Sequence, residues 1–385
     1  MRYLVIPAVG VGLLLHAIVG IDVWRVAKEA ARPGHFVEAP SRVLTAHARI
    51  DLQLGLAGLA DRSRPAPERF EVYQAQLRRG RDLLIRSLDV NPAQPDALAT
   101  LATIGYELDP TDAATTLARV ETAAMLAPRV PRVQAQLGEL LLRMGHADTA
   151  LTYLARGVEL DPSLSDRVVR LASAHGFAAE KIRDALPRGA PTLTALRHAF
   201  DADGLDRYLT WVEVAIGEET ITPSRELLLA YGRSGVQIGQ APRVAKRLEA
   251  WGPYEDTGLE AIRLMQFARA TLHSGDPQTA LALARTSQSM DVESDQLAVF
   301  LGDTARAASQ PDLALRSYRH GLMLLARRNA QPRARAYVYR RIGELHEDLY
   351  QLDLAYDAYA KALQIFPEEP FARARMKALS PGDGS

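Results

Sequence analysis

Apolar residues recur at intervals of three and four along most of the chain, and short polar segments rich in Gly, Pro, Asn and Asp separate these runs. Such spacing gathers the apolar side chains on one face of an α-helix, whereas a strand alternates with period two. Long β-branched runs with that alternation are absent from the sequence, and Ala, Leu and Arg favour helix. The pattern predicts an all-α protein built from many amphipathic helices.

Proline residues end several of these predicted helices at a nearly constant interval. Pro92, Pro128 and Pro162 are 36 and 34 residues apart, and each follows an apolar-periodic segment. A fixed period of this size indicates a repeated helix pair, in which proline stops the second helix. Such repeats stack into a solenoid in which each unit packs only on its neighbours.

Two segments, 131–162 and 336–367, share residue types at the same offsets. Glycine stands at the eighth place, alanine at the twentieth and proline at the last: Gly138, Ala150 and Pro162 in one segment, Gly343, Ala355 and Pro367 in the other. Small residues at these places let the two helices approach closely. The segments closely resemble the tetratricopeptide repeat (TPR) family, and the resemblance implies a right-handed α-solenoid of roughly seven or eight units.

Further units with these offsets begin near residues 98, 165, 225, 261 and 295. In the unit at 225, Val244 occupies the small-residue place, so we expect a rotated or shifted second helix there. The spacing between the units at 295 and 336 grows to 41, which predicts a lengthened helix or a bulged turn. We expect an anchor at 1–25, a linker and N-terminal helix pair at 26–91, TPR units at 92–187, a degenerate helical segment at 188–224, TPR units at 225–367, and a capping helix and tail at 368–385.

The segment from Tyr3 to Trp24 contains no Lys, Arg or Glu. Its length matches the roughly 20 residues that span a bilayer core, and an aromatic residue stands at each end, as is typical of membrane interfaces. We therefore predict a retained single-pass transmembrane helix in an inner (cytoplasmic) membrane; a cleaved signal and a buried helix are the alternatives. We expect the solenoid on the periplasmic side, which the absence of cysteine favours. The cytoplasmic side is the alternative, because the flanking Lys and Arg favour it.

Four residues of this segment recur at intervals of four: Ala8, Gly12, His16 and Gly20. Small residues at this spacing allow another membrane helix to approach closely, and an ionisable residue inside a membrane usually faces protein. We predict that this stripe contacts another membrane subunit or a second copy; a plain tether is the alternative.

Composition excludes several kinds of chemistry. The chain has no cysteine, which removes disulfides, thiolate metal sites and cysteine nucleophiles. Lys and Arg together number 46, as do Asp and Glu, so nucleic acid is not an expected partner. No phosphate-binding loop, G-x-S-x-G or H-E-x-x-H motif occurs. We expect no enzyme activity, catalytic residue, cofactor or metal.

In TPR proteins the first helix of each unit lines a groove that binds peptides. The resemblance implies that the second, fifth, ninth, twelfth and thirteenth places face it, and these include Tyr106, Arg132, Glu139, Arg143, Arg233, Arg269, Asp303, Arg306, Tyr337, Arg340 and Glu344. Because arginine is frequent in this set, an acidic peptide segment is the expected ligand.

An arginine-rich segment, 327–341, has two interpretations. It is either an anionic docking patch or a solvated turn whose arginines pair with Glu344, Glu347 and Asp348.

The sequence as a whole predicts a non-enzymatic, membrane-tethered TPR scaffold that recruits or assembles protein partners in a bacterial envelope. A cytoplasm-facing adaptor that regulates a membrane enzyme or protease is one alternative. An accessory subunit of a stable membrane complex is another.

Overall fold

The computed structural model describes residues 39–60, 65–201, 203–218 and 220–379. These residues form nineteen α-helices and two short 3₁₀ turns, with no strand among them. The all-α prediction is therefore confirmed for the described part of the chain. The chain divides into two compact units, unit 1 (residues 1–187) and unit 2 (residues 188–385), and each is described by itself.

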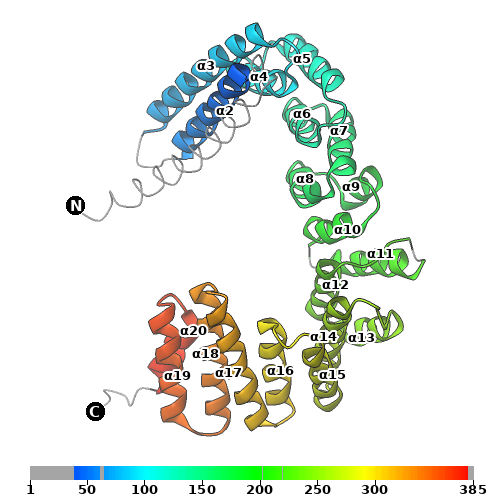
Figure 1. Ribbon diagram of the computed structural model, residues 1–385, viewed down its shortest axis with the longest axis vertical. Helices are drawn as coiled ribbons and strands as arrows, with labels where there is room; N and C mark the ends of the chain where they lie inside the picture. The colour runs from blue at the N-terminus through cyan, green and yellow to red at the C-terminus, as the bar shows by residue number, and fades with distance from the viewer. Residues whose placement is uncertain (1–38, 61–64, 202, 219, 380–385) are drawn as a thin grey trace, which may run out of the picture. The chain divides into compact units, whose positions relative to one another are not determined.

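Unit 1 is a series of helices that pack against their neighbours in chain order (Figure 1). Its helices are α2 (Ala39–Ala60), α3 (Ala66–Val90), α4 (Pro95–Leu108), α5 (Ala113–Leu126), α6 (Pro131–Arg143), α7 (Ala147–Leu160), the 3₁₀ turn η1 (Pro162–Leu164), α8 (Ser165–Ala174) and α9 (Ala179–Ala185).

Unit 2 continues in the same manner. Its helices are α10 (Ala190–Leu196), the 3₁₀ turn η2 (Arg197–Ala199), α11 (Leu205–Gly217), α12 (Arg225–Gln237), α13 (Ala241–Ala250), α14 (Thr257–His273), α15 (Pro277–Met290), α16 (Asp295–Ala307), α17 (Pro311–Arg327), α18 (Pro332–Asp348), α19 (Leu352–Ile365) and α20 (Pro370–Leu379).

Two kinds of residue start these helices. Proline is the first helical residue of six of them, where its missing N–H leaves no hydrogen bond unmade: Pro95, Pro131, Pro277, Pro311, Pro332 and Pro370. In five helices the side chain at the N-cap accepts a hydrogen bond from the backbone N–H three residues further on, and one of these, α15, also begins with proline. The N-cap residues are Asp112, Ser224, Asp256, Asp276 and Ser294. The local sequence thus fixes most boundaries between helices.

The TPR-type contact inside a helix pair is present at the glycines of the eighth place. A Cβ atom on Gly138 would overlap Leu154, one on Gly302 would overlap Tyr318, and one on Gly343 would overlap Tyr359. Each partner is a fully buried side chain of the second helix. The close approach that the offsets predict is therefore confirmed in these three pairs.

The pair of α12 and α13 departs from the other helix pairs, as the valine at the small-residue place predicts. Helix α13 packs more extensively on α14 than on α12, and the eighth-place Gly232 packs against Gln266 of α14 rather than against α13. Val244 is still fully buried. The space for it comes from α12, because a Cβ atom on Gly235 would overlap the Val244 side chain. A second glycine on α12 thus compensates for the larger residue on α13.

The long spacing before residue 336 is shared between two helices. Helix α17 has 17 residues, whereas α15 has 14, and α18 begins at Pro332 rather than near residue 336. In unit 1, by contrast, α9, the second helix of the repeat that begins near residue 165, has only 7 residues.

The predicted membrane helix and its stripe, Ala8, Gly12, His16 and Gly20, lie outside the described residues. Within the described ranges, no helix is both long enough and apolar enough to cross a membrane.

Candidate functional site

In unit 2, the first helices of consecutive repeats lie next to one another, since α14 packs against α16 and α16 against α18. A hollow of roughly 600 Å³ opens between these three helices. Its lining comes from α14 (Arg269, Leu272, His273), from α16 (Phe300, Asp303, Arg306, Ala307) and from α18 (Tyr337, Arg341, Asp348). We call this hollow the groove site.

Ion pairs join the walls of the groove site. The Arg306 guanidinium donates to Glu344 at 2.6 Å and to Asp348 at 2.5 Å. Arg341 donates to Asp303 at 2.7 Å and to Glu344 at 2.5 Å. Burial disfavours the charge of Arg341, but these carboxylates outweigh it and raise its pKa. Two of the arginines are therefore neutralised within the protein, and they connect α16 to α18.

Asp303 also receives a hydrogen bond from the core of its own unit. The Tyr318 hydroxyl, on the second helix α17, donates to the same Asp303 oxygen at 2.8 Å. Burial, followed by the nearby Asp303 charge, raises the pKa of Tyr318, so this phenol stays a donor. The position of Asp303 is thus set by both a core tyrosine and a groove arginine.

Arg269 stands in a different environment. Its guanidinium donates a 3.0 Å hydrogen bond to the Gln266 side-chain oxygen and lies 5.3 Å from the centre of the Phe300 ring. Burial and then the positive charge of Arg233 hold the pKa of Arg269 below its ordinary value. Its charge is therefore less well compensated than that of Arg306 or Arg341.

Arg340 lies beside the groove site rather than in its lining. Its guanidinium lies 4.9 Å from the centre of the Tyr337 ring and 5.0 Å from that of Phe371. It also pairs with Glu344 at 3.6 Å and Glu369 at 3.5 Å. These contacts tie α18 to α20, because Phe371 belongs to that last helix.

Three of the four predicted groove residues of unit 1 come together. Arg143 pairs with Glu139 at 2.7 Å and with Glu107 at 2.8 Å, and the Tyr106 hydroxyl donates to the backbone oxygen of Arg143 at 3.0 Å. Glu139 also pairs with Arg167 of α8 at 2.7 Å. These contacts connect α4, α6 and α8 in the manner seen in unit 2.

The fourth, Arg132, does not join this group. It is exposed in the first turn of α6, and its positive charge acts on Asp161, at the other end of the α7 helix from the groove residues. A position early in the first helix therefore lies too far along the axis to reach Glu139 and Arg143, about two and three turns further on.

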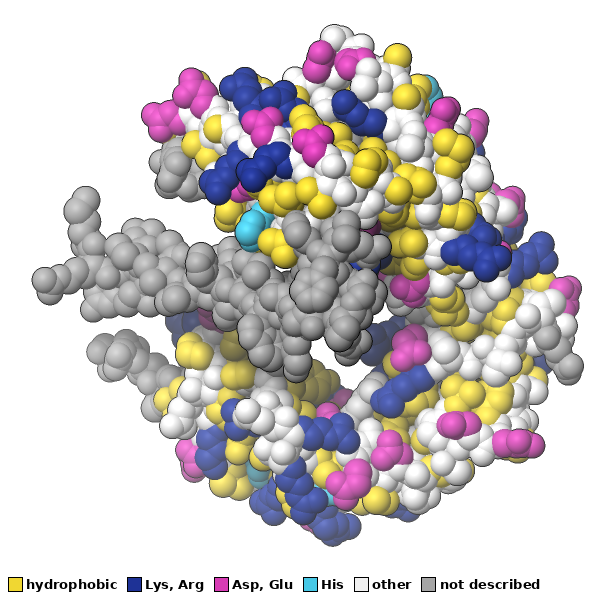
Figure 2. All heavy atoms as spheres, turned by 45° about the horizontal axis from the view of Figure 1, so that its top comes forward, with side chains coloured by type: hydrophobic (Ala, Val, Ile, Leu, Met, Phe, Trp, Pro, Cys, Tyr) yellow, Lys and Arg dark blue, Asp and Glu magenta, His cyan; other side chains and the backbone are white. Residues whose placement is uncertain are grey.

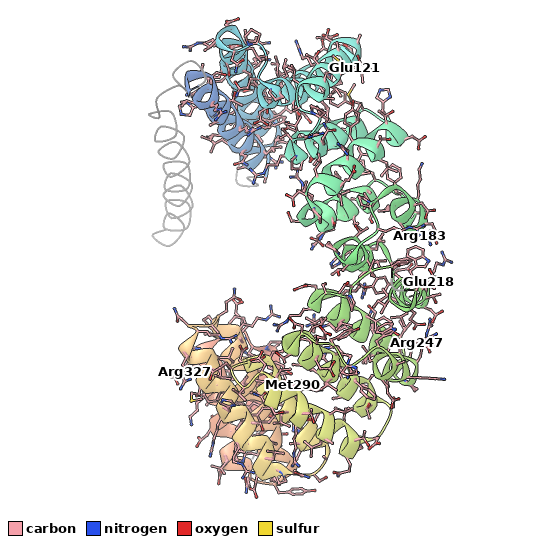
Figure 3. All side chains as sticks on the ribbon, turned by 45° about the vertical axis from the view of Figure 1, so that its right-hand side comes forward. Glu121, Arg183, Glu218, Arg247, Met290 and Arg327 are labelled. Carbon is pink, nitrogen blue, oxygen red and sulfur yellow. The ribbon has the colours of Figure 1, made fainter. Side chains whose placement is uncertain are left out.

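The arginine-rich segment splits into two parts. Arg328 pairs with Asp295 at 2.8 Å and Arg327, which is labelled in Figure 3, with Glu293 at 3.7 Å, at the C-terminal end of α17. Arg340 and Arg341 belong to α18 and pair with Glu344, as the solvated interpretation expects. These four arginines are therefore paired with carboxylates of the protein rather than gathered in one anion-binding patch. Figure 2 likewise shows Lys and Arg interspersed with Asp and Glu over the visible face.

The offset rule missed two residues of the groove site. Phe300 and Arg341 both occupy the sixth place of their units, which the rule does not include. The rule does include the twelfth and thirteenth places, where Leu272, His273, Ala307 and Asp348 line the hollow. A search for aromatic and arginine side chains at the sixth place supplies the missing signal.

The site offers arginine donors, carboxylate acceptors and an aromatic wall, all fixed on rigid helices. Such a combination suits the recognition of a polar peptide segment. The fold and the site thus define an α-helical repeat protein with a groove of mixed charge on its first helices.

No protein-family profile and no curated protein matches the chain. Solved structures of low identity do match it. The APC/C hetero-tetramer Cut9–Hcn1 is 15% identical over 89% of this chain, with a TM-score of 0.41. This chain covers 63% of the length of that chain. The C-terminal part of a TPR repeat-containing protein from Cytophaga hutchinsonii is 12% identical over 77% of this chain and 93% of its own, with a TM-score of 0.32. Pseudomonas aeruginosa pilF is 12% identical over 86% of this chain and 97% of its own, with a TM-score of 0.25.

Proposed function

We propose that this protein is a non-enzymatic scaffold that binds an extended segment of a partner protein along the first helices of unit 2. The groove site carries this proposal, because three consecutive first helices supply its lining. Four of the groove residues that the repeat offsets predict meet there, namely Arg269, Asp303, Arg306 and Tyr337. An extended segment can contact successive repeats in this way, since each repeat has the same geometry.

The charge of the groove site suits a polar partner rather than an apolar one. Arg306 and Arg341 are held by carboxylates from the neighbouring helix, so they present ordered donors. Phe300 and Tyr337 supply aromatic surface beside them. A partner segment with polar groups and an occasional apolar side chain matches this lining.

Filling the groove site with a large side chain tests this function. Ala307 is exposed and lines the hollow, so an Ala307→Trp substitution fills it without entering the core. Ala282 is exposed on the second helix α15 and provides the matched control, Ala282→Trp. Full-length tagged protein should capture a partner from detergent-solubilised membranes of its host, and A307W alone should lose it.

Two results would remove the proposal. One is a set of captured proteins that is the same for wild type, A307W and A282W, because binding would then not involve the groove site. The other is the absence of any partner for the wild-type chain in gentle detergent.

We also propose that the scaffold is tethered to a bacterial membrane through residues 3–24. The length and composition of that segment support the tether. Carbonate extraction should leave the full-length chain in the membrane fraction. Active alkaline phosphatase fused to the C-terminus would favour the envelope scaffold with an external solenoid, and an inactive fusion would favour the cytoplasm-facing adaptor.

A further inference from the structure

Arg269 differs from the other two arginines of the groove site in lacking an acidic partner. Over the part of the chain that the structure describes, it forms no ion pair. Asp303 attracts it electrostatically, but that carboxylate already accepts hydrogen bonds from Arg341 at 2.7 Å and from Tyr318 at 2.8 Å. A half-buried arginine without a counter-charge is unusual, because burial makes an uncompensated charge costly.

A second arginine accompanies it. Arg233 occupies the same ninth place one unit earlier, on α12, and it too forms no ion pair with the described residues. Its neighbour Gly232 packs directly against the Gln266 side chain, and Gln266 in turn accepts the hydrogen bond from Arg269. The packing of α12 on α14 thus brings two like charges close together, and burial together with Arg233 lowers the pKa of Arg269.

The surroundings of Arg269 leave it ready to bind an anion. The Phe300 ring stacks near the guanidinium and Gln266 occupies only one of its N–H groups, so further donors stay available. A planar guanidinium recognises a carboxylate through two parallel hydrogen bonds. Asp303 and Asp348 line the same hollow, and their charges would repel a dianionic phosphate more than a single carboxylate.

We propose that Arg269, assisted by Arg233, is a seat for one carboxylate of the partner segment at the α12–α14 end of the groove site. This inference rests on the proposed function, because it assigns a ligand group to the same groove. The carboxylate is either an Asp or Glu side chain or the free C-terminus of the partner. Peptides that carry only one of these two kinds of carboxylate distinguish the two sources.

Three pools of random, N-acetylated hexapeptides test the seat. The first pool contains no acidic residue and has an amidated C-terminus, the second adds one Glu to that composition, and the third has no acidic residue but a free C-terminal carboxylate. Each pool is passed over immobilised full-length protein, and the retained peptides are quantified by mass spectrometry. We expect retention of the second or the third pool to exceed that of the first by about tenfold, as for a charge-assisted pair at a partly buried site. The pool with the higher retention identifies the source of the carboxylate.

Substitution of Arg269 connects this preference to the seat. Arg269→Gln should abolish the preference for carboxylate. Arg285→Gln is the matched control, because Arg285 also donates to a single glutamine, Gln310 at 2.7 Å, but lies on the second helix α15. Arg233→Gln changes an exposed side chain and should reduce the preference by about twofold to threefold, as a nearby charge does. Circular dichroism confirms that each variant is folded.

The outcomes separate the seat from the proposed function. A carboxylate preference that persists in R269Q would overturn the seat. So would equal retention of all three pools by the wild type, and if A307W then abolished that retention the groove function would stand. No retention of any pool by the wild-type chain would contradict both proposals.

Discussion

The ring of Tyr318 packs directly against the backbone of Gly302, so that a Cβ atom on Gly302 would overlap it. The same ring is fully buried, and its hydroxyl holds Asp303 at the groove site. The core of a repeat and the groove are therefore linked through one tyrosine. Any change that displaces this ring should alter both stability and the position of Asp303.

Replacing Gly302 with alanine tests the close approach. The added methyl group forces the Tyr318 ring away, and overpacking of this kind costs about 1–3 kcal/mol, against a gain of about 1 kcal/mol in helix propensity. We expect a net loss of about 1 kcal/mol in the free energy of unfolding, measured by urea denaturation.

Gly217→Ala is the control for that substitution. Gly217 lies in the last turn of α11 with no atom within 4 Å of the position of a Cβ. The same replacement there should be neutral or stabilising, since only the propensity changes. Equal effects at the two glycines would show that the contact with Tyr318 does not limit the packing.

The pairing of Gly235 with Val244 predicts a coupled pair of substitutions. Gly235→Ala should cost about 1–3 kcal/mol through overpacking, and Val244→Ala should cost a similar amount through the cavity it leaves. Because the smaller side chain makes room for the new methyl group, the double variant should be more stable than the sum of the two effects predicts, by about 1 kcal/mol or more. Additive effects would contradict the compensation.

Much of the fold could be predicted from the sequence because the repeats are regular. The glycine and alanine offsets located the helix pairs, since only small residues allow the observed approach of α6 to α7 or of α18 to α19. The valine at position 244 predicted a departure of α13 from the other pairs, and α13 does pack more extensively on α14 than on α12. The way in which Val244 is accommodated could not be predicted, because an offset rule compares one position at a time. The compensating Gly235 lies on the partner helix, where only the three-dimensional contact reveals it.

The groove was harder to predict than the core. The repeat offsets predicted Arg269, Asp303, Arg306 and Tyr337 as groove residues, but they could not show which arginines are paired with a carboxylate. That depends on contacts 38 and 42 residues apart along the chain, such as Arg341 with Asp303 and Arg306 with Asp348. Arg132 meets the offset rule equally well and still lies apart from the others.

The degenerate segment supplies a buried carboxylate that the repeat pattern gave no reason to expect. Glu213 of α11 is 8% exposed, and it accepts hydrogen bonds from the Tyr231 hydroxyl at 2.7 Å and from Arg243 at 2.8 Å. This carboxylate therefore joins α11 to the helix pair α12 and α13.

Glu213→Ala tests that connection. The substitution leaves the buried Tyr231 hydroxyl without its acceptor and removes one of the two carboxylates that pair with Arg243, the other being Asp206. We expect a loss of about 2–3 kcal/mol in the free energy of unfolding, measured by urea denaturation. Glu218→Ala, in the C-cap of the same helix, is the control and should change it by less than about 0.5 kcal/mol. A loss for E213A no larger than that of the control would show that Glu213 does not hold these helices together.

The last helix, α20, is held by an ion pair whose strength should depend on pH. Arg375 donates to both carboxylate oxygens of Glu347 on α18, and this hydrogen bonding, opposed by burial, lowers the pKa of Glu347 from its ordinary value of 4.5. Because the pKa is lower in the folded state, the carboxylate stabilises the fold above pH 4.5, and the contribution is lost as the pH falls through the folded-state value.

Glu347→Gln should therefore lower the free energy of unfolding by about 1 kcal/mol at pH 7, as for a partly exposed bidentate pair. At about pH 3 the difference between the variant and the wild type should largely disappear, because protonated Glu347 resembles Gln. Urea denaturation at both pH values measures the difference, and Glu293→Gln, whose partner Arg327 lies 3.7 Å away on an exposed surface, serves as the control with little effect at either pH. A difference for E347Q that stays constant between the two pH values would show that the ion pair with Arg375 does not hold α20 in place.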